Sequence, residues 1–404
     1  MDNSAAAVRI TDDVYWVGAI DRDLRDFHGY STERGTTYNA FLIRAEKVAL
    51  IDTVRAPFFD EMMARIASVI EPSQIDYIVS NHSEMDHTGC LPQTIASVQP
   101  EKVFASANGL KALAAHFHMD LGATAVADGE TVSLGNRTLA FYETRMLHWP
   151  DSMFCYLPEE EMLFSQDGFG MHLASDERFA DEIDPILLRE QTAKYYANIL
   201  LPFSPMVKIA LEKAAGLRIG AILPDHGPVW RKNPGLVIEW YGAWAAQKPA
   251  PKALIVYDTM WHSTAAMAGA VADGLRAEAI EPVLCRASDC HRSNIATEYL
   301  ECGALVVGTP TLNASLFPAM ADVLSYLKGL KRKNLIGAVF GSYGWNGEGV
   351  AQAKEALAAM KIPLVAEPVS VQYVPDDPAL ERCRALGREI AIKMKESLLM
   401  RGCE

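Results

Sequence analysis

The sequence has few of the features that mark secreted and metal-clustered proteins. Its seven cysteines are an odd number scattered over 404 residues, and no Cys-x-x-Cys pair occurs. This pattern disfavours a disulfide framework, an iron–sulfur cluster and a zinc site built on cysteines. We therefore expect reduced thiols.

Long apolar runs and an excess of basic charge are also missing. No apolar run approaches the roughly 18 residues of a membrane helix, and the N-terminal segment lacks a basic start followed by an apolar stretch. Lys and Arg number 37 against 51 Asp and Glu, which gives a formal net charge of −14. Nucleic acid and anionic membranes are therefore poor partners. We expect a cytoplasmic protein whose partners are small molecules and proteins.

The composition and length indicate a globular protein of two or three domains, because half of the residues are apolar. Two prolines in the segment 247–252 separate a helical pattern from the strand-like run 253–257. We expect a domain boundary there, with one domain over 1–250 and a second over 251–404. The sequence shows no internal repeat.

The second half alternates short apolar runs with helical patterns. We expect strands near 253–257, 281–285, 304–308, 334–340 and 364–372, and helices near 264–278, 292–302, 316–328, 348–360 and 377–399. This alternation predicts a doubly wound parallel sheet, whose ligands bind at the carboxyl ends of the strands. No Gly-x-Gly-x-x-Gly follows a strand, so a nicotinamide dinucleotide fold is not indicated.

The first half mixes strands and helices in a less regular order. Strand-like runs cover 38–43, 48–52, 77–80, 138–143 and 162–165, helical patterns cover 58–70 and 88–98, and a helix-rich stretch runs to about 246. This mixture predicts an α/β layered domain with its sheets inside. The strand order stays open.

One polar segment in the first half concentrates metal-ligand side chains. The segment 82–87 reads His-Ser-Glu-Met-Asp-His and directly follows the expected buried strand 77–80. Side chains of this kind at a strand end converge on a small volume if the segment forms a tight loop. The alternative interpretation is a solvated loop in which Asp86 or Thr88 caps the next helix.

Three further loops favour the metal interpretation because they present the same chemistry. His148 and His226 each lie in a short loop that closes an apolar run, and Asp167 follows the run 162–165 in the same way. Four such loops in order indicate one site built from separate strand ends.

Together these loops resemble the metallo-β-lactamase-like fold, in which a His-x-His-x-Asp-His loop, a later His, an Asp and a last His hold two metals. This sequence departs from the pattern because Glu84 occupies the position of the second histidine. A carboxylate is a harder and more anionic ligand than imidazole, which favours redox-active iron over zinc.

The resemblance implies a role for each ligand residue. One iron would be held by His82, Glu84 and His148, the other by Asp86, His87 and His226, and Asp167 would bridge the two. Whether His87 reaches a metal stays open, because adjacent residues must turn strongly to face one ion. His28 is a further candidate, as a catalytic group lining the site.

The second half contains a candidate flavin site in three loops that follow strands. Hydroxyl groups and backbone N–H groups at a helix N-terminus can bind a phosphate, and an aromatic, glycine-rich loop suits a flat ring. The alternatives are an ordinary Ser/Thr cap and aromatics that only pack. The expected contacts are Thr259, Met260, Trp261, Ser263, Thr264, Thr309, Pro310, Thr311, Leu312, Asn313, Ser342, Tyr343, Gly344, Trp345 and Gly347. The three loops resemble flavodoxin and its FMN site.

Joined, the two halves resemble the flavodiiron proteins over nearly the whole chain, in the minimal two-domain class. The resemblance implies FMN and two bridged iron ions as cofactors. It also implies reduction of O2 to water, of NO to N2O, or of both, with electrons from a rubredoxin-like donor. Members of the family assemble head to tail, so a homodimer or a dimer of dimers is expected.

Two other functional classes are compatible with parts of the sequence. A dinuclear zinc hydrolase of the metallo-β-lactamase superfamily would explain the first domain and leave the second as an accessory. A flavodoxin-like electron carrier attached to an inactive metal domain would turn over flavin without consuming gas. The sequence does not separate O2 from NO as the substrate, because both are small, neutral and apolar.

Overall fold

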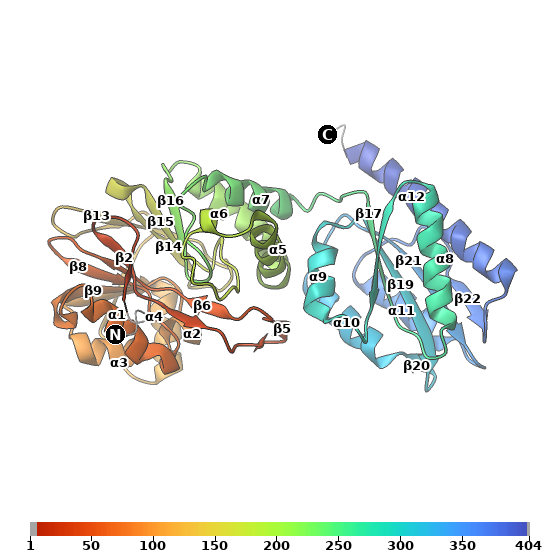
Figure 1. The fold of residues 1–404 in the computed structure, drawn as a ribbon, viewed down its shortest axis with the longest axis horizontal. Coiled ribbons are helices and arrows are strands. Elements are labelled where there is room, and N and C mark those ends of the chain that lie inside the picture. The colour runs from red at the N-terminus through yellow and green to blue at the C-terminus, as the bar shows by residue number, and fades with distance from the viewer. Residues whose placement is uncertain (1–5, 402–404) are drawn as a thin grey trace. The chain divides into compact units, whose positions relative to one another are not determined.

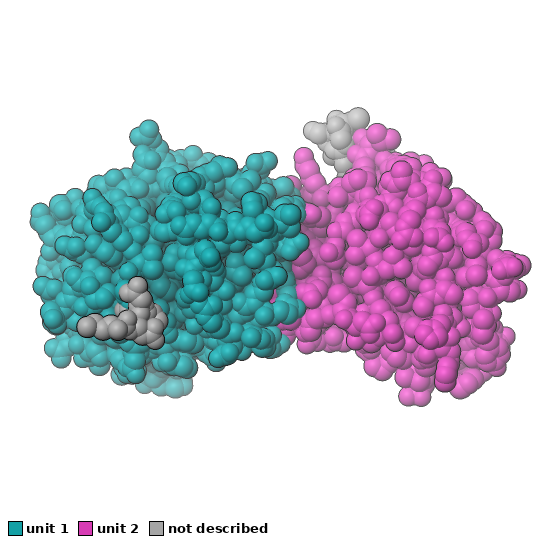
Figure 2. Space-filling model, in the orientation of Figure 1, with its two compact units in different colours: residues 1–28, 32–196, 203–245 teal, residues 29–31, 197–202, 246–404 magenta. Residues whose placement is uncertain are grey.

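The computed structural model describes residues 6–401, which fold into two compact units (Figure 2). Unit 1 contains the residues up to His28, Thr32–Tyr196 and Phe203–Ala245, and unit 2 contains Gly29–Ser31, Ala197–Pro202 and the chain from Ala246 onward. No helix of the described residues combines the length and apolar character needed to cross a bilayer. The six described cysteines are free thiols, and Cys403 lies outside the described residues.

Unit 1 is built on two sheets that pack face to face (Figure 1). The first has the order β1 (Val8–Arg9), β2 (Val14–Trp16), β7 (Phe41–Ile43), β8 (Val48–Ile51), β9 (Ile75–Ser80), β10 (Lys102–Ser106), β11 (Ala123–Val126). The second has the order β12 (Thr131–Ser133), β13 (Thr138–Glu143), β14 (Met153–Leu157), β15 (Met162–Gln166), β16 (Ala221–Pro224). Short strands also occur: β3 (Ala19–Asp21) pairs with β6 (Thr36–Tyr38), and β4 (Asp26–Phe27) and β5 (Tyr30–Ser31) lie in the loop between them.

The apolar residues of the first sheet alternate between two cores because successive strand residues face opposite sides. Phe41 and Ile51 pack between the sheets against Phe141 and Phe164, whereas Leu42 and Leu50 face the helices on the outer side. The helices that supply this outer core are α1 (Phe59–Ala67), α3 (Leu91–Val98) and α4 (Ala107–Phe117). The remaining helices of the first half are α2 (Met85–Thr88), α5 (Pro185–Tyr195), α6 (Ser204–Ala214) and α7 (Gly235–Ala246).

The expected strand over 38–43 is wrong as a single element, because the chain changes sheets inside it. Tyr38 ends β6, and Phe41 begins β7 in the seven-stranded sheet. Between them the side-chain amide of Asn39 donates hydrogen bonds to the backbone carbonyls of Pro224 and Gly227, at 2.7 and 2.9 Å. These contacts with a distant loop bend the chain, and such a contact is invisible in a local pattern.

Unit 2 is a parallel sheet with helices on both faces, as the alternation of its segments predicts (Figure 1). The strand order is β18 (Glu281–Arg286), β17 (Lys252–Tyr257), β19 (Ala304–Leu312), β21 (Ile336–Tyr343), β22 (Val369–Gln372), with β20 (Ser315–Leu316) paired to the end of β19. The helices are α8 (Ser263–Ala277), α9 (Arg292–Glu301), α10 (Pro318–Gly329), α11 (Glu348–Ala359) and α12 (Asp377–Arg401). The expected strand over 364–372 is too long, because Leu364 makes only an isolated bridge with Gly337 before β22 begins.

Candidate metal centre and cofactor pocket

The seven ligand candidates lie at the ends of strands in unit 1. His82 and Glu84 follow β9, and Asp86 and His87 lie in the single turn α2. The others follow β13, β15 and β16. All seven side chains are at least largely buried, and they form two groups whose ligand atoms lie within 4.8 Å of one another: His82, Glu84, His148 and Asp167, and Asp86, His87 and His226.

Asp167 contacts both groups, one with each carboxylate oxygen. Its Oδ2 lies 2.9 Å from His148 Nε2 and 3.4 Å from His82 Nε2. Its Oδ1 lies 3.2 Å from His87 Nε2 and 3.5 Å from His226 Nε2. Asp167 is therefore the side chain that the two ligand groups share.

Each group is completed by a further carboxylate. Glu84 Oε2 lies 3.2 Å from His82 Nε2 and 3.1 Å from His148 Nε2. In the other group Asp86 lies 3.4 Å from His87 Nε2 and 3.2 Å from His226 Nε2. Because α2 turns the chain between neighbouring residues, His87 faces the same group as Asp86, the arrangement that the sequence left open.

The Nδ1 atoms of three of the ligand histidines face an oxygen atom outside the cluster. Asp151 Oδ2 lies 3.4 Å from His82 Nδ1, and Asp225 Oδ2 lies 3.5 Å from His87 Nδ1. The carbonyl oxygen of Thr37 lies 2.6 Å from His226 Nδ1. Such outer partners fix the ring orientation and leave Nε2 for a metal. Sequence reasoning missed them; the only signal was that Asp225 directly precedes a candidate ligand.

The electrostatics of the cluster are those of an anionic site. Burial opposes protonation of His82, but hydrogen bonds with Asp151 and Glu84 raise its pKa to about 10. Burial alone would raise the pKa of Asp167, yet the charges and hydrogen bonds of the histidines hold it well below its usual range. Nearby carboxylates also raise the pKa of His87 and His148. Without metal, His82, His87 and His148 therefore hold protons against the carboxylates, and metal cations would displace those protons.

The side chain of Asp86 tests whether the site fits a metal. Both of its carboxylate oxygens are buried, and neither accepts a hydrogen bond from any described residue. A buried carboxylate that accepts no hydrogen bond is costly, and a cation bound among these ligands would satisfy it. The mixture of imidazole and carboxylate donors suits iron.

The other candidate of the first half, His28, lies at the edge of this site. Its side chain is 76 % exposed, and its Nε2 lies 3.5 Å from Glu84 Oε1. It lines a cavity of about 550 Å³ together with Glu84 and Asp86. The cavity leads from the surface to two of the metal-ligand candidates, so a small molecule can approach them past His28.

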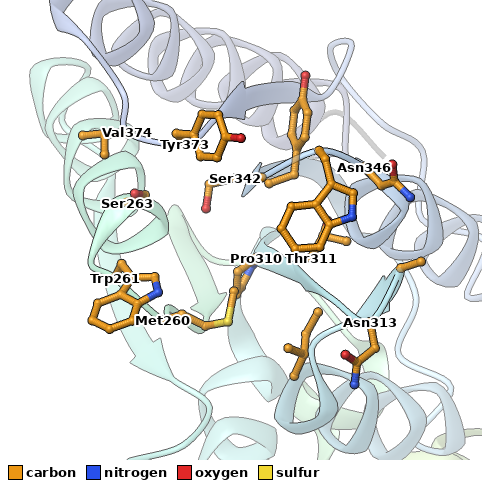
Figure 3. Close-up of a pocket in the computed structure, with 15 residues that line it drawn as sticks. Met260, Trp261, Ser263, Pro310, Thr311, Asn313, Ser342, Asn346, Tyr373 and Val374 are labelled. Carbon is orange, nitrogen blue, oxygen red and sulfur yellow. The ribbon is translucent and has the colours of Figure 1, made fainter.

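Unit 2 has a cavity of about 510 Å³ at the carboxyl ends of its strands (Figure 3). Met260 and Trp261 lie on one side of it and Asn346 on the other, with Pro310 and Ser342 between them. The two tryptophans of the lining, Trp261 and Trp345, are 86 % and 84 % exposed. Two exposed indoles beside a cavity suit a flat aromatic ligand.

The structure brings most of the expected flavin contacts to this cavity and leaves four away from it. The expected residues that line it are Met260, Trp261, Ser263, Pro310, Thr311, Leu312, Asn313, Ser342, Tyr343, Gly344 and Trp345. The expected residues outside the lining are Thr259, Thr264, Thr309 and Gly347. Thr264 and Thr309 are fully buried, and Thr264 instead hydrogen-bonds Ser342 at 2.8 Å, which supports the cavity wall. Sequence reasoning missed Ala314, Asn346, Tyr373 and Val374.

The N-terminus of α8 is a candidate for the phosphate end of the pocket. No side chain caps this helix, and its N-cap residue His262 has a φ of 67°. The first N–H groups of α8 are therefore available to a phosphate next to Ser263, which lines the cavity. The cavity and this helix end together fit FMN.

Comparisons with known proteins agree with this geometry. Residues 36–227 match the family described as ODP family beta lactamase, and residues 255–387 match flavodoxin. A nitric oxide reductase of Moorella thermoacetica is 45% identical over 395 residues, which cover 96% of this chain and 99% of that protein.

Solved structures show the same two-domain arrangement of elements along the chain. The rubredoxin oxygen:oxidoreductase of Desulfovibrio gigas matches with a TM-score of 0.95 and 44% identity, over 97% of this chain and 99% of that one. The flavodiiron protein of Giardia intestinalis matches with a TM-score of 0.93 and 32% identity, over 98% of each chain.

Proposed function

This chain belongs to the flavodiiron protein family, and on that premise we propose that its two halves reduce O2 to water, NO to N2O, or both. It is an oxidoreductase, with FMN in the flavodoxin-type domain and a di-iron centre in the metallo-β-lactamase-type domain. When bound, the iron ions and the flavin supply the electrons and the open coordination positions that reduction of a diatomic gas needs.

The observation that carries the proposal is the sharing of Asp167 between two ligand groups. Its two oxygens face different histidine pairs, so metals in both groups would lie close enough to act on one small substrate. Glu84 and Asp86 complete the groups and also line the cavity that opens beside His28. These residues would hold both metals and leave an approach from the side of Glu84 and Asp86.

The chain's own residues set the charge and orientation of the centre. Three carboxylates offset most of the charge of two ferrous ions, so a nearly neutral centre can form in a buried site. Asp151 and the Thr37 carbonyl hold the rings of His82 and His226 through hydrogen bonds, and the charge of Asp225 lies 3.5 Å from His87 Nδ1.

We propose seven metal ligands: His82, Glu84, Asp86, His87, His148, Asp167 and His226. His28 is proposed as a catalytic group because only its ring, among the histidines that are not ligands, both lines the cavity and contacts Glu84. The cavity residues of unit 2, with the N-terminus of α8, are proposed to hold FMN.

The donor, the assembly and the location are proposals of the same kind. We propose a rubredoxin-like carrier as the donor, a head-to-tail homodimer or dimer of dimers, and a cytoplasmic location. The name of the Desulfovibrio gigas protein supports the donor. The domain boundary is proposed at 250/251, in the segment that joins α7 to β17.

The proposal is tested by gas consumption after reduction of the purified protein. Iron and FMN are quantified first, and the reduced protein is then mixed with O2 or NO in a stopped-flow instrument. We expect His82→Asn to abolish consumption of both gases while FMN stays bound and reducible. His118→Asn is the matched control, because His118 is exposed at the end of α4. Full gas consumption by His82→Asn would refute the site assignment.

The alternative of a zinc hydrolase is not favoured. Two relatives that match along nearly the whole chain are named as a nitric oxide reductase and as a rubredoxin oxygen:oxidoreductase. Metal analysis that found zinc without iron would reopen the hydrolase.

A further inference from the structure

The segment that leads from strand β17 to helix α8 begins with a buried carboxylate. Asp258 directly follows β17, and its side chain is buried. Its Oδ1 accepts the backbone N–H of Thr259 at 2.7 Å, whereas its Oδ2 accepts no hydrogen bond from any described residue. The next two residues, Met260 and Trp261, line the flavin pocket, and α8 begins at Ser263. A negative charge is therefore buried at the start of the segment that leads to the candidate phosphate end.

A guanidinium group from the neighbouring strand faces this carboxylate. Arg286 ends β18, where its register partner on β17 is Tyr257. Its Nε lies 3.3 Å from Asp258 Oδ1, and Ser288 Oγ lies 3.4 Å from the same oxygen. The guanidinium also contacts the exposed carboxylate of Asp289, at 3.4 Å. Because a buried carboxylate without a nearby cation is costly, Arg286 offsets the charge of Asp258.

The lining of the flavin pocket offers no charged side chain to a phosphate, because it consists of apolar, aromatic and uncharged polar residues. FMN and riboflavin share the same ring and differ in the phosphate group, which carries about two negative charges near neutral pH. That phosphate is therefore sensitive to the net charge at the start of the segment. With Arg286 in place the pair is neutral. Without Arg286 the buried charge of Asp258 would repel the phosphate through an interior that screens charge poorly.

We propose that Arg286 sets the preference of this pocket for FMN over riboflavin by neutralising Asp258. Arg286 is not among the residues that line the cavity, so it is a positioning residue that acts through Asp258 and not a contact of the flavin. The inference rests on the FMN pocket proposed above and adds to it the origin of its selectivity for a phosphorylated flavin.

The test measures the Kd values of FMN and of riboflavin by fluorescence titration of the full-length protein after its FMN has been removed. In Arg286→Gln we expect the Kd of FMN to rise at least about tenfold, because the carboxylate of Asp258 then repels the phosphate. The Kd of riboflavin should change less than about twofold, because riboflavin carries no phosphate. Arg276→Gln is the matched control. It removes a positive charge from an exposed pair with Asp273 in the last turn of α8, and both Kd values should stay the same.

Replacing the carboxylate provides a second measurement. Asp258→Asn keeps an oxygen that can accept the Thr259 N–H and removes the negative charge beside Arg286, so FMN should bind at least about threefold more tightly while riboflavin binding stays the same. In the double variant Asp258→Asn, Arg286→Gln, the Kd of FMN should lie within about threefold of the native value. These two variants keep the test decisive if Arg286→Gln does not fold, because neither leaves a buried carboxylate without its cation.

Three results would overturn the proposal. They are an equal loss of FMN and riboflavin binding in Arg286→Gln, unchanged FMN binding in that variant, and a double variant that binds FMN as weakly as Arg286→Gln does. Native protein that binds no FMN would refute the pocket and with it this inference. Native protein that binds FMN more tightly than riboflavin, with that preference unchanged in the variants, would refute this inference alone.

Discussion

The metal centre and the flavin pocket place their binding groups in opposite surroundings. The seven ligand candidates are largely buried, with His82 fully so, and they are held by carboxylates and carbonyls behind them. The flavin pocket is open, and its largest side chains, Trp261 and Trp345, are almost as exposed as in an extended chain. The first site would bind metal ions through charged side chains that are buried in the protein. The second would bind FMN through the shape of the pocket and the N–H groups at a helix N-terminus.

The two sites differ because the two cofactors bring different binding groups with them. Bare metal ions need all their ligands from the protein, so four separate strand ends must converge, and the cost of burying the carboxylates is recovered only when the ions bind. FMN brings its own apolar ring and phosphate. The pocket therefore has to offer only surfaces and N–H groups.

The largest effect on this difference is expected when the charge of Asp167, which both ligand groups share, is removed. Asp167→Asn leaves both ligand groups short of one anion, so we expect iron content to fall to one ion or fewer per chain and gas reduction to fall by at least about 100-fold. Elemental analysis and stopped-flow kinetics measure the two effects. FMN content should not change. Asp181→Asn, a surface carboxylate paired with Arg231, is the control, and full iron content in Asp167→Asn would contradict the shared role.

A smaller effect on iron binding is expected when a carboxylate that contacts a histidine Nδ1 atom is replaced. Asp151→Asn keeps an oxygen that can accept the Ser83 N–H but removes the negative charge next to His82 Nδ1. We expect about 10- to 100-fold weaker binding of iron at the first group, measured by competition with a chelator. An unchanged affinity would show that the ring is oriented by packing alone.

The pH dependence of stability should differ between the metal-free and the iron-loaded protein. The pKa of His82 is raised from 6.5 to about 10 in the metal-free site, so its contribution to stability is complete below pH 6.5 and is lost as pH rises through about 10. We expect the free energy of unfolding of the metal-free protein to fall across this window in urea denaturation. The iron-loaded protein should not show this fall, because the metal has displaced the proton. The same pH dependence of the free energy of unfolding in both forms would contradict this prediction.

The smallest effect is expected in the open pocket. Trp345→Ala removes a stacking surface worth about 0.5–1.5 kcal/mol, so we expect FMN to bind about 2- to 12-fold more weakly in a fluorescence titration. The free energy of unfolding and the iron content should stay the same, since this indole is exposed. Leu399→Ala, an exposed apolar residue outside the pocket, is the control. A loss of stability in Trp345→Ala would show that the indole packs as part of the fold.

Local patterns predicted unit 2 more closely than unit 1. In a parallel α/β sheet each strand and helix appears as a separate run, and the ligand edge follows from the strand ends. Two expected contacts, Thr264 and Thr309, nevertheless do not line the pocket. Both side chains are buried, and the hydroxyl of Thr264 hydrogen-bonds that of Ser342. In unit 1 the break between Tyr38 and Phe41 depends on Asn39 meeting a loop almost two hundred positions away, which no local pattern contains.

The sequence by itself determined which side chains could bind metal and where a flavin loop could form, because residue type and position after a strand are local properties. Only the tertiary structure decided that Asp167 faces both ligand groups, that His87 shares a group with Asp86, and that Asp151 and Asp225 stand behind the histidines. These facts are distances between atoms far apart in the chain. They arise when two sheets pack together and bring their strand ends to one place.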